Sequence, residues 1–502
     1  MLDSKFAALF AKQQSMSKQL FGTDGIRGVP GEFPLDDATL LRVGAALGHY
    51  LRGAKTDAPN RVLIGRDTRE SGPHIEKCIA RGLAAAGTEA FSSGVLTTPG
   101  VAWVVRNEGF AAGVVISASH NPYHDNGVKL VSSSGMKFPD AIEAEIEHEI
   151  LSPETHEQVD APARIESDPK LEEDYLASLR AMVPRGVKLA GMKIVLDCAN
   201  GASSALAPRL FRSLGADVVA MNDRPDGRNI NAGCGSLHPE AMQKKVVETR
   251  AAMGVAFDGD ADRAIFSSAS GKLVDGDGVL LSMGRYMKAR GTMKGSTIVG
   301  TTMANLGLER ALDKSGLKLA RVAVGDRYVL EEMQRSGANL GGEQSGHILF
   351  LDDATTGDGM LTAVKMAALV AAEGPLDALV ADLKIFPQTI VNVKVKAKPP
   401  LDSLPEVSST LAEAERTLGN SGRVVLRYSG TEKLARVMVE AERDEDVRRW
   451  ADALAGAVKT AVSTTPSVAS VIEGASTLRN VANRVRSPPS NRISASAIEP
   501  VR

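Results

Sequence analysis

Ser119 lies in the first of four loops whose residue types could do chemistry, SASHNPYHDNGVK (117–129). It follows an apolar run, and a hydroxyl held at such a turn can act as a nucleophile or carry a phosphoryl group if a base and a countercharge are near. His120, His124 and Lys129 are neighbours that could fill those roles. The alternative is an ordinary Ser/Asn turn with solvated histidines, and this loop alone does not decide between them.

A second loop, DGDADR (258–263), alternates three carboxylates, Asp258, Asp260 and Asp262. In an extended loop they can converge on one hard cation. An EF-hand would need glycine at its sixth position and glutamate at its twelfth, where this chain has Arg263 and Ala269. The pattern therefore indicates either a Mg²⁺ site or a solvated acidic turn, and the apolar stretch MGVAF before it favours the metal.

The third loop, GGEQSGH (341–347), places Glu343, Ser345 and His347 between glycines. Glycines let the backbone approach a ligand closely, and this mixture of donors and acceptors suits sugar hydroxyls or an ammonium group. A polar turn without any ligand would look the same, so the loop is weak evidence by itself.

The fourth loop, RYSGTEKLAR (427–436), holds a Ser-Gly-Thr turn between two arginines. Turn amides and hydroxyls flanked by guanidinium groups are typical of an anion site, in which the arginines clamp a phosphate. The four loops are spaced at intervals of about one small domain each. A nucleophile, a metal, polyol contacts and a phosphate clamp together describe phosphoryl transfer on a sugar phosphate.

The overall composition is that of a soluble globular protein. The 502 residues are 43% hydrophobic and 24% charged, with 59 Lys+Arg against 61 Asp+Glu and a net charge of −2. Near-neutral charge argues against bulk binding to nucleic acid, and no apolar run approaches the ~18 residues of a membrane span. Three cysteines without a C-x-x-C pair fit a reducing cytosol. We therefore expect a cytoplasmic protein with no nucleic-acid or membrane partner.

Apolar runs followed by Gly- or Asp-rich turns and helical stretches recur along the chain, for example at 61–72, 111–122, 192–203, 253–263 and 296–307. Continuously apolar strands are covered on both faces, which predicts α/β layers with parallel or mixed sheets and ligands at the carboxyl ends of the strands. Composition breaks fall at 151–170, near 270–280 and at 384–405, and the Ser/Pro-rich stretch after 465 predicts a mobile tail.

Five stretches in order resemble the α-D-phosphohexomutases, namely FGTDGIRG (21–28), the serine loop with NGVK, DGDADR, GEQSGH and R-x-SGTE. The resemblance covers residues 20–460 and implies three similar α/β domains with mixed sheets and a smaller C-terminal α+β domain around a central active-site cleft. We place these domains at 20–170, 171–275, 276–385 and 386–463. Residues 1–19 are expected to be a disordered leader, with Met16 as an alternative start, and 464–502 a disordered tail.

The motifs GTDGIRG and GEQSGH most resemble family members that act on glucosamine phosphates, whereas relatives acting on glucose or mannose phosphates more often have Met or Glu in place of Gln344. The resemblance implies an isomerase that interconverts glucosamine 6-phosphate and glucosamine 1-phosphate, a step toward UDP-N-acetylglucosamine. It implies a phosphoserine enzyme, a 1,6-bisphosphate intermediate, a hexose 1,6-bisphosphate activator, and a monomer or homodimer. Action on mannose or glucose phosphates is the alternative.

By the family pattern, Ser119 carries the phosphoryl group, and one Mg²⁺ per chain is held by Asp258, Asp260, Asp262 and a phosphoserine oxygen. Lys129 and His120 are implied in proton transfer, and Arg27 and Arg263 in steadying phosphoryl charge. Glu343, Ser345 and His347 are implied in sugar binding. The residues implied in binding the non-reacting phosphate are Arg427, Ser429, Gly430, Thr431 and Arg436.

The fourth loop departs from the family pattern, which usually continues SGTEP, because Lys433 follows Glu432 and Tyr428 precedes the serine. This departure bears on specificity more than on activity. A phosphoserine-type phosphatase would share the nucleophile and the metal but would need no second phosphate clamp. A catalytically dead sugar-phosphate-binding protein would have lost Ser119 or an aspartate of the metal loop, and none is missing.

Overall fold

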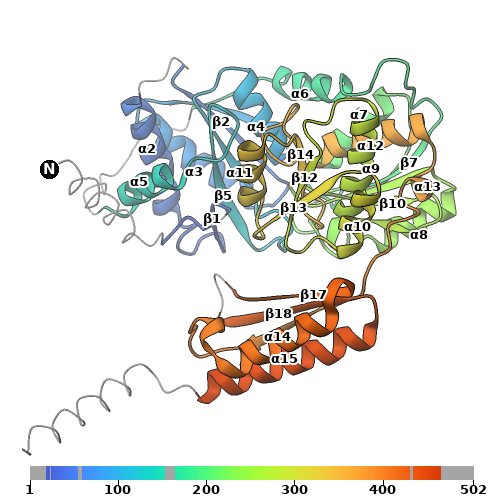
Figure 1. The fold of residues 1–502 in the computed structure, drawn as a ribbon. Helices are drawn as coiled ribbons and strands as arrows, with labels where there is room; N and C mark the ends of the chain where they lie inside the picture. The colour runs from blue at the N-terminus through green and yellow to red at the C-terminus, as the bar shows by residue number, and fades with distance from the viewer. Residues whose placement is uncertain (1–18, 23, 55–58, 153–163, 430–432, 465–502) are drawn as a thin grey trace, which may run out of the picture. The chain divides into compact units, whose positions relative to one another are not determined.

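The computed structural model describes residues 19–22, 24–54, 59–152, 164–429 and 433–464. The chain divides into two compact units, Met1–Ile385 and Phe386–Arg502 (Figure 1). The predicted leader and tail lie outside the described residues except for Gln19 and Thr464, and Gly430 and Thr431 also lie outside them. Among the helices that the structure describes, none is long and apolar enough to cross a membrane.

The first sheet of the larger unit has six strands in the order β1-β5-β4-β2-β3-β6. Strand β2 runs parallel to β3 and β4, and β6 runs parallel to β3, whereas β5 is antiparallel to both β4 and β1. The strands are β1 (Ile26–Gly28), β2 (Arg61–Arg66), β3 (Glu89–Val95), β4 (Ala112–Ile116), β5 (Asn126–Ser132) and β6 (Ile165–Ser167), with helices α2 (Asp37–Gly53), α3 (Gly72–Ala85), α4 (Thr98–Asn107) and α5 (Asp140–Leu151).

The second sheet has the order β11-β10-β9-β7-β8 and the third the order β13-β12-β14-β15. The second comprises β7 (Lys193–Asp197), β8 (Asp217–Met221), β9 (Met253–Phe257), β10 (Ala264–Ser268) and β11 (Leu273–Val274), with helices α6 (Lys170–Arg180), α7 (Ser203–Ser213), η2 (Gly235–Leu237) and α8 (Glu240–Thr249). The third comprises β12 (Thr297–Thr301), β13 (Lys318–Val322), β14 (Leu340–Gly342) and β15 (Ile348–Phe350), with α9 (Gly276–Ala289), α10 (Leu306–Lys314), α11 (Asp326–Ser336), α12 (Gly359–Glu373) and α13 (Leu376–Leu379).

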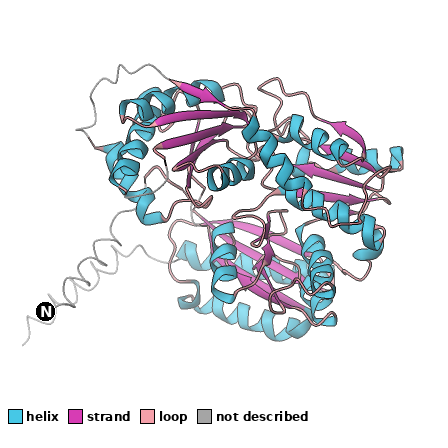
Figure 2. Cartoon of the chain, turned by 90° about the horizontal axis from the view of Figure 1, so that it is seen from above, coloured by secondary structure: helices cyan, strands magenta, loops and turns pink. Residues whose placement is uncertain are grey.

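One topology is repeated in all three sheets, each of which is flanked by helices in Figure 2. The shared strand orders are β5-β4-β2-β3, β10-β9-β7-β8 and β15-β14-β12-β13. In each case the first two strands of the order form the antiparallel pair and the others are parallel. This confirms three similar α/β domains with mixed sheets. The serine loop (117–129), the metal loop (258–263) and the sugar loop (341–347) occupy the same place in each repeat, at the connection between the two antiparallel strands.

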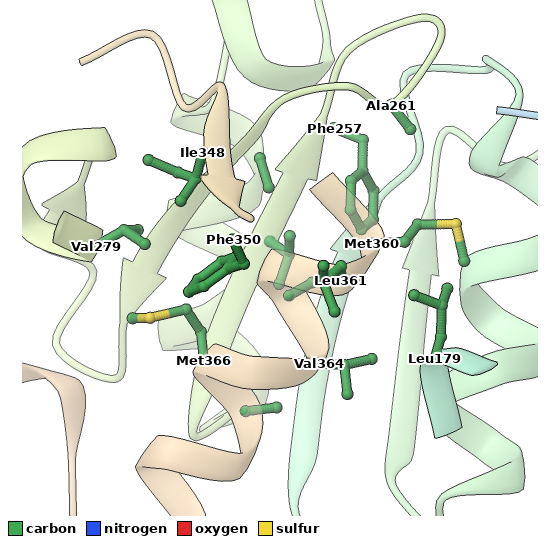
Figure 3. Close-up of a cluster of buried hydrophobic side chains, with 14 of the residues drawn as sticks. Leu179, Phe257, Ala261, Val279, Ile348, Phe350, Met360, Leu361, Val364 and Met366 are labelled. Atoms are coloured by element: carbon green, nitrogen blue, oxygen red, sulfur yellow. The ribbon is translucent and has the colours of Figure 1, made fainter. Parts of the chain in front are cut away.

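A continuous apolar core joins the three domains. Phe257 at the end of β9, Phe350 on β15 and Met360 on α12 belong to one buried cluster that also includes Leu179 of α6 (Figure 3). Helix α12 is buried along most of its length, from Gly359 to Val370. The three site loops are therefore anchored to a common core, which limits how far they can move apart.

The smaller unit contains a three-stranded antiparallel sheet in the order β16-β18-β17. Its elements are β16 (Gln388–Lys394), η3 (Leu401–Ser403), α14 (Pro405–Leu418), η4 (Gly419–Ser421), β17 (Gly422–Tyr428), β18 (Leu434–Ala441) and α15 (Asp444–Thr464). Val437 of β18 packs with Val407 of α14 and with Trp450 and Leu454 of α15 in a core of its own. The predicted α+β unit is confirmed, and the fourth loop connects β17 to β18.

Candidate active site

The turn between β4 and β5 presents Ser119 to the metal loop. Ser119 is only 1% exposed, and its backbone φ of +52° is uncommon for a residue with a side chain. Its Oγ donates a hydrogen bond of 2.6 Å to Oδ2 of Asp258, and Nδ1 of His120 lies 3.4 Å from the same Oγ. Strained residues of this kind cluster at functional sites, because the surrounding structure must hold them there.

Three carboxylates converge in the metal loop between β9 and β10. Asp258, Asp260 and Asp262 are buried and offer oxygens that all lie within 4.8 Å of one another. Burial, followed by repulsion from its two neighbours, raises the pKa of Asp258 well above its usual range, and burial, followed by repulsion from Asp260, raises the pKa of Asp262. Burial alone would also raise the pKa of Asp260, but the nearby Lys129 ammonium and a hydrogen bond from Thr98 outweigh it and lower that pKa to about 2.

This cluster fits a divalent cation. Oδ1 of Asp260 and Oδ1 of Asp262 are buried and accept no hydrogen bond from any described residue. A buried acceptor without a partner costs about 1–3 kcal/mol, so two such oxygens in one loop fit a site for a cation. Carboxylate oxygens are the ligands that Mg²⁺ prefers, and a cation would also relieve the repulsion that raises the pKa of Asp258.

Lys129 lies between two carboxylates. Its Nζ is 3.0 Å from Oδ2 of Asp24 and 3.2 Å from Oδ2 of Asp260, and Asp24 also pairs with Arg27 at 2.5 Å. Burial would lower the pKa of Lys129, but the two carboxylates raise it above its ordinary value. Strand β1 pairs with β5 so that Arg27 lies opposite Gly127, which brings Arg27 beside Lys129. As a fixed ammonium, Lys129 can neutralise charge or donate a proton, but it is a poor proton acceptor.

His120 is the neutral partner in this group. Burial, followed by the charges of Arg263 and Arg27, lowers its pKa to about 4. At neutral pH the imidazole is therefore uncharged and has one nitrogen free to accept a proton. The structure thus distinguishes the two residues that the sequence offered for proton transfer.

The sugar loop between β14 and β15 is joined to the metal loop through the backbone. The carbonyl of Gly346 accepts a hydrogen bond of 3.1 Å from the amide of Ala264, just after the metal loop. Within the loop, Ser345 Oγ lies 3.3 Å from Oε2 of Glu343, and Oε1 of Glu343 accepts from the amide of Gly325 at 3.1 Å. Ser345 is exposed and Glu343 half-buried, so both can reach a ligand from solvent.

Two more predicted residues have unsatisfied polar atoms beside this loop. Nδ1 of His347 and Nε of Arg263 are buried without a hydrogen-bond partner among the described residues, and so is Nε of Arg27. Arg263 Nε is 3.7 Å from Oδ1 of Asp262, beyond hydrogen-bond range. The sequence assigned all three of these residues to the site, and an anionic ligand would supply hydrogen-bond acceptors for their nitrogens.

The smaller unit holds the fourth loop. Arg427 and Arg436 lie directly opposite each other on β17 and β18. Burial, followed by the charge of Arg436, lowers the pKa of Arg427. The carbonyl of Ser429 accepts from Nζ of Lys398 at 2.6 Å, which adds a third cation that the sequence reading missed. Like charges facing each other across a strand pair are destabilising, so the arrangement favours an anion between the arginines.

Comparison with known protein families shows to which family the chain belongs. Four domain models of the phosphoglucomutase/phosphomannomutase family match in order, domain I at residues 18–157, domain II at 173–271, domain III at 275–386 and the C-terminal domain at 390–457. The chain belongs to this family. The match confirms the predicted phosphohexomutase resemblance and its isomerase class.

Relatives in the family are similar over nearly their whole length. The chain is 52% identical over 454 residues to a protein of Koribacter versatilis named phosphoglucosamine mutase, covering 89% of this chain and 97% of that one. It is 51% identical over 447 residues to a protein of the same name from Solibacter usitatus, covering 88% and 99%. A crystal structure of a phosphoglucomutase/phosphomannomutase family protein from Burkholderia thailandensis matches with a TM-score of 0.74 at 25% identity, covering 90% of this chain and 99% of that one.

Several residues that contact this candidate site could not be predicted from the sequence. Asp24 lies in the motif FGTDGIRG, but nothing in the sequence shows that it pairs with Lys129. Thr98 begins α4, and its Oγ1 donates a 2.6 Å hydrogen bond to Oδ2 of Asp260. Asn231 donates to the carbonyl of Ser119 at 2.8 Å. Both side chains reach loops of another domain, and such contacts leave no local pattern in a sequence.

Proposed function

We propose that this chain interconverts glucosamine 6-phosphate and glucosamine 1-phosphate. The observation that carries the proposal is the identity of 51–52%, over 88–89% of the chain, to two proteins named phosphoglucosamine mutase. The buried serine beside a carboxylate cluster supports phosphoryl transfer, and the paired arginines of the fourth loop support a substrate that carries a second phosphate.

The proposed reaction has two phosphoryl transfers. In the first, the bond between phosphorus and Oγ of phosphorylated Ser119 breaks, and a bond forms between phosphorus and the free hydroxyl oxygen of the sugar phosphate. The hydroxyl loses its proton, Oγ gains one, and the product is glucosamine 1,6-bisphosphate. In the second, the bisphosphate presents its other phosphate to Ser119 and the same bonds are exchanged in reverse. Atoms and charge balance over the cycle, and the enzyme ends phosphorylated.

His120 and Lys129 divide the proton transfers in this proposal. His120 is neutral at pH 7 and accepts the proton of the attacking hydroxyl, whereas Lys129 is an ammonium and donates a proton to Oγ of Ser119 as the phosphoryl group leaves it. Arg27 and Arg263 add positive charge to the same group. Because little covalent chemistry falls to the protein in phosphoryl transfer, fixed charges of this kind account for most of the catalysis.

Asp258, Asp260 and Asp262 would hold one Mg²⁺ together with an oxygen of phosphorylated Ser119. When bound, the ion neutralises charge on the transferring phosphoryl group. Asp258 orients the unphosphorylated serine even without the ion, since it accepts the hydrogen bond of the Ser119 hydroxyl.

The remaining roles concern recognition of the substrate. Glu343, Ser345 and His347 contact the sugar, and the non-reacting phosphate is held by Arg427, Ser429, Gly430, Thr431 and Arg436. A hexose 1,6-bisphosphate activates the enzyme by phosphorylating Ser119. We propose a cytoplasmic enzyme that works as a monomer or homodimer.

A side-by-side assay tests the substrate. Glucosamine 6-phosphate, mannose 6-phosphate and glucose 6-phosphate are supplied separately to the full chain with Mg²⁺ and glucose 1,6-bisphosphate, and each 1-phosphate product is measured. We expect kcat/KM to be highest for glucosamine 6-phosphate, and no turnover by Ser119→Ala. A higher kcat/KM for mannose or glucose 6-phosphate would replace the proposed activity with phosphomannomutase/phosphoglucomutase activity.

A further inference from the structure

Arg69 is a fully buried arginine beneath the serine loop. It lies in the connection between β2 and α3, and its side chain is 0% exposed, as is that of Asp67, with which it forms an ion pair of 2.9 Å. A guanidinium cannot lose its proton at physiological pH, so burying one costs several kcal/mol unless its donors are satisfied. The role of such a residue follows from the groups to which it donates hydrogen bonds.

All five N–H groups of Arg69 have acceptors, and four of these are backbone carbonyls of the serine loop. Nη2 donates to the carbonyls of Ser119 at 3.0 Å and Asn121 at 2.8 Å. Nη1 donates to the carbonyls of Asp125 at 2.9 Å and Pro122, and Nε donates to Asp67. The guanidinium is planar and rigid, so the carbonyls that it binds are fixed relative to one another.

The Asp67–Arg69 ion pair also holds the backbone amide of Ser119, through the hydroxyl of Ser117. The amide of Ser119 donates to Oγ of Ser117 at 2.9 Å, and that hydroxyl donates in turn to Oδ2 of Asp67 at 2.6 Å. Both the amide and the carbonyl of Ser119 are thus tied to the Asp67–Arg69 pair. A left-handed backbone at a residue with a side chain is strained, so it persists only where the surroundings enforce it.

We infer that Arg69 is a positioning residue for phosphoryl transfer, one that fixes the backbone of Ser119 and thereby the direction of its Oγ. The inference rests on the proposed function. All five donors of Arg69 are used within the protein, so none is left to bind a substrate or Oγ of Ser119.

The variant Arg69→Lys tests this role. An ammonium keeps the charge but has three donors from a single nitrogen, so it cannot hold four carbonyls and Asp67 in one plane. We expect kcat to fall about 100-fold, because a displacement of about 1 Å at a reacting group has that effect. The KM for glucosamine 6-phosphate should stay nearly unchanged. Phosphorylation of dephosphorylated Ser119 by glucose 1,6-bisphosphate, followed by intact mass, should slow by the same factor.

Arg61→Lys is the matched control. Arg61 is the first residue of β2, the strand that Arg69 follows. It donates to the carbonyls of Glu108 and Gly109, in a loop at the end of β2 away from Arg69. Its replacement removes a similar brace and should lower the melting temperature without changing kcat. A purely structural role for Arg69 predicts the same for Arg69→Lys.

A folded Arg69→Lys variant with kcat within about threefold of the parent would overturn the inference. Should it not fold, Ser117→Ala replaces it, since it removes one hydroxyl and cuts the link between the ion pair and the amide of Ser119. There, a fall in kcat of about tenfold with KM unchanged supports the inference, and an unchanged kcat contradicts it. An inactive parent protein would instead contradict the proposed function, so the two failures are distinguishable.

Discussion

The hydroxyl of Ser119 donates a 2.6 Å hydrogen bond to Oδ2 of Asp258, and this contact joins the corresponding loops of two repeated domains. Each loop connects the two strands of an antiparallel pair at the edge of a parallel set. The repeat therefore places a serine hydroxyl in one domain opposite carboxylates in the next. The contact requires the backbones of the two loops to approach closely. It also depends on which of the three carboxylates in the metal loop are ionised.

Gly259→Ala should separate the two loops. A Cβ on Gly259 would lie 2.5 Å from the carbonyl oxygen of Ser119, which Arg69 and Asn231 hold in place, so the metal loop would have to move away. We expect kcat to fall at least about tenfold and stability to fall by about 1–3 kcal/mol. Steady-state kinetics and thermal melting measure both. Gly53→Ala, where nothing lies within 4 Å of an added Cβ, should change neither, and equal behaviour of the two variants would refute the explanation.

Removal of the metal should abolish turnover reversibly. Chelation by EDTA should stop the reaction and Mg²⁺ should restore it, and Mg²⁺ should also raise the melting temperature, since it binds the folded state. Asp262→Asn, which removes one carboxylate of the cluster, should weaken both effects. Asp382→Asn serves as the control because its carboxylate pairs with Arg285 instead. A melting temperature that rises equally with Mg²⁺ in Asp262→Asn would place the ion elsewhere.

Asp358 should make stability depend on pH. Its carboxylate caps α12 and accepts from the hydroxyl of Tyr175 at 2.9 Å, and burial raises its pKa to about 6. Because the folded pKa lies above the unfolded value of about 4, the stability contributed by this group is present below pH 4 and is lost as pH rises through 6. The loss is at most about 3 kcal/mol.

The variant Asp358→Asn cannot ionise and keeps an oxygen for the helix cap. Relative to the parent, its free energy of unfolding should therefore rise between pH 4 and pH 6.5, as measured by denaturant titration. Asp382→Asn, which replaces a carboxylate whose pKa is lowered chiefly by a hydrogen bond from Arg285, should not rise in this way. Parallel curves for the parent and Asp358→Asn would show that the carboxyl ionises without cost.

Arg427→Met should weaken substrate binding without destabilising the smaller unit. The loss of a charged donor to a phosphate should raise the KM for glucosamine 6-phosphate about 10- to 100-fold. The melting temperature should stay the same or rise, because the substitution ends the repulsion between Arg427 and Arg436. Arg443→Met removes an exposed arginine that pairs with Asp446 and should leave KM unchanged. An unchanged KM in Arg427→Met would remove this arginine from the phosphate site.

The strands and the loops that follow them were predictable from the sequence because their signals are local. The run before DGDADR forms β9, which is buried throughout, and the turn after it carries the carboxylates. Part of the segment 151–170, predicted as a connector, forms a strand instead. Ile165–Ser167 forms the edge strand β6, and because its three residues are all exposed it has no apolar pattern to reveal it.

The support beneath the site was not predictable in the same way. Arg69 binds backbone carbonyls 50 to 56 residues away, and a carbonyl is present at every position whatever the side chain. Thr98 and Asp260 are 162 residues apart and meet only because two domains share a core. The sequence identifies residues whose side-chain type the chemistry requires. Contacts that depend on how the domains pack appear only in the structure.

The most direct test follows the phosphoryl group of Ser119. The full chain is labelled at this serine with ³²P, using labelled glucose 1,6-bisphosphate, freed of excess label and mixed with glucosamine 6-phosphate and Mg²⁺ in a single turnover. We predict that the label leaves the protein and appears in glucosamine 1,6-bisphosphate and then in the glucosamine monophosphates, and that Ser119→Ala takes up no label. Label released as inorganic phosphate would show a phosphatase, and label that stays on Ser119 would contradict phosphoryl transfer from this residue to the sugar.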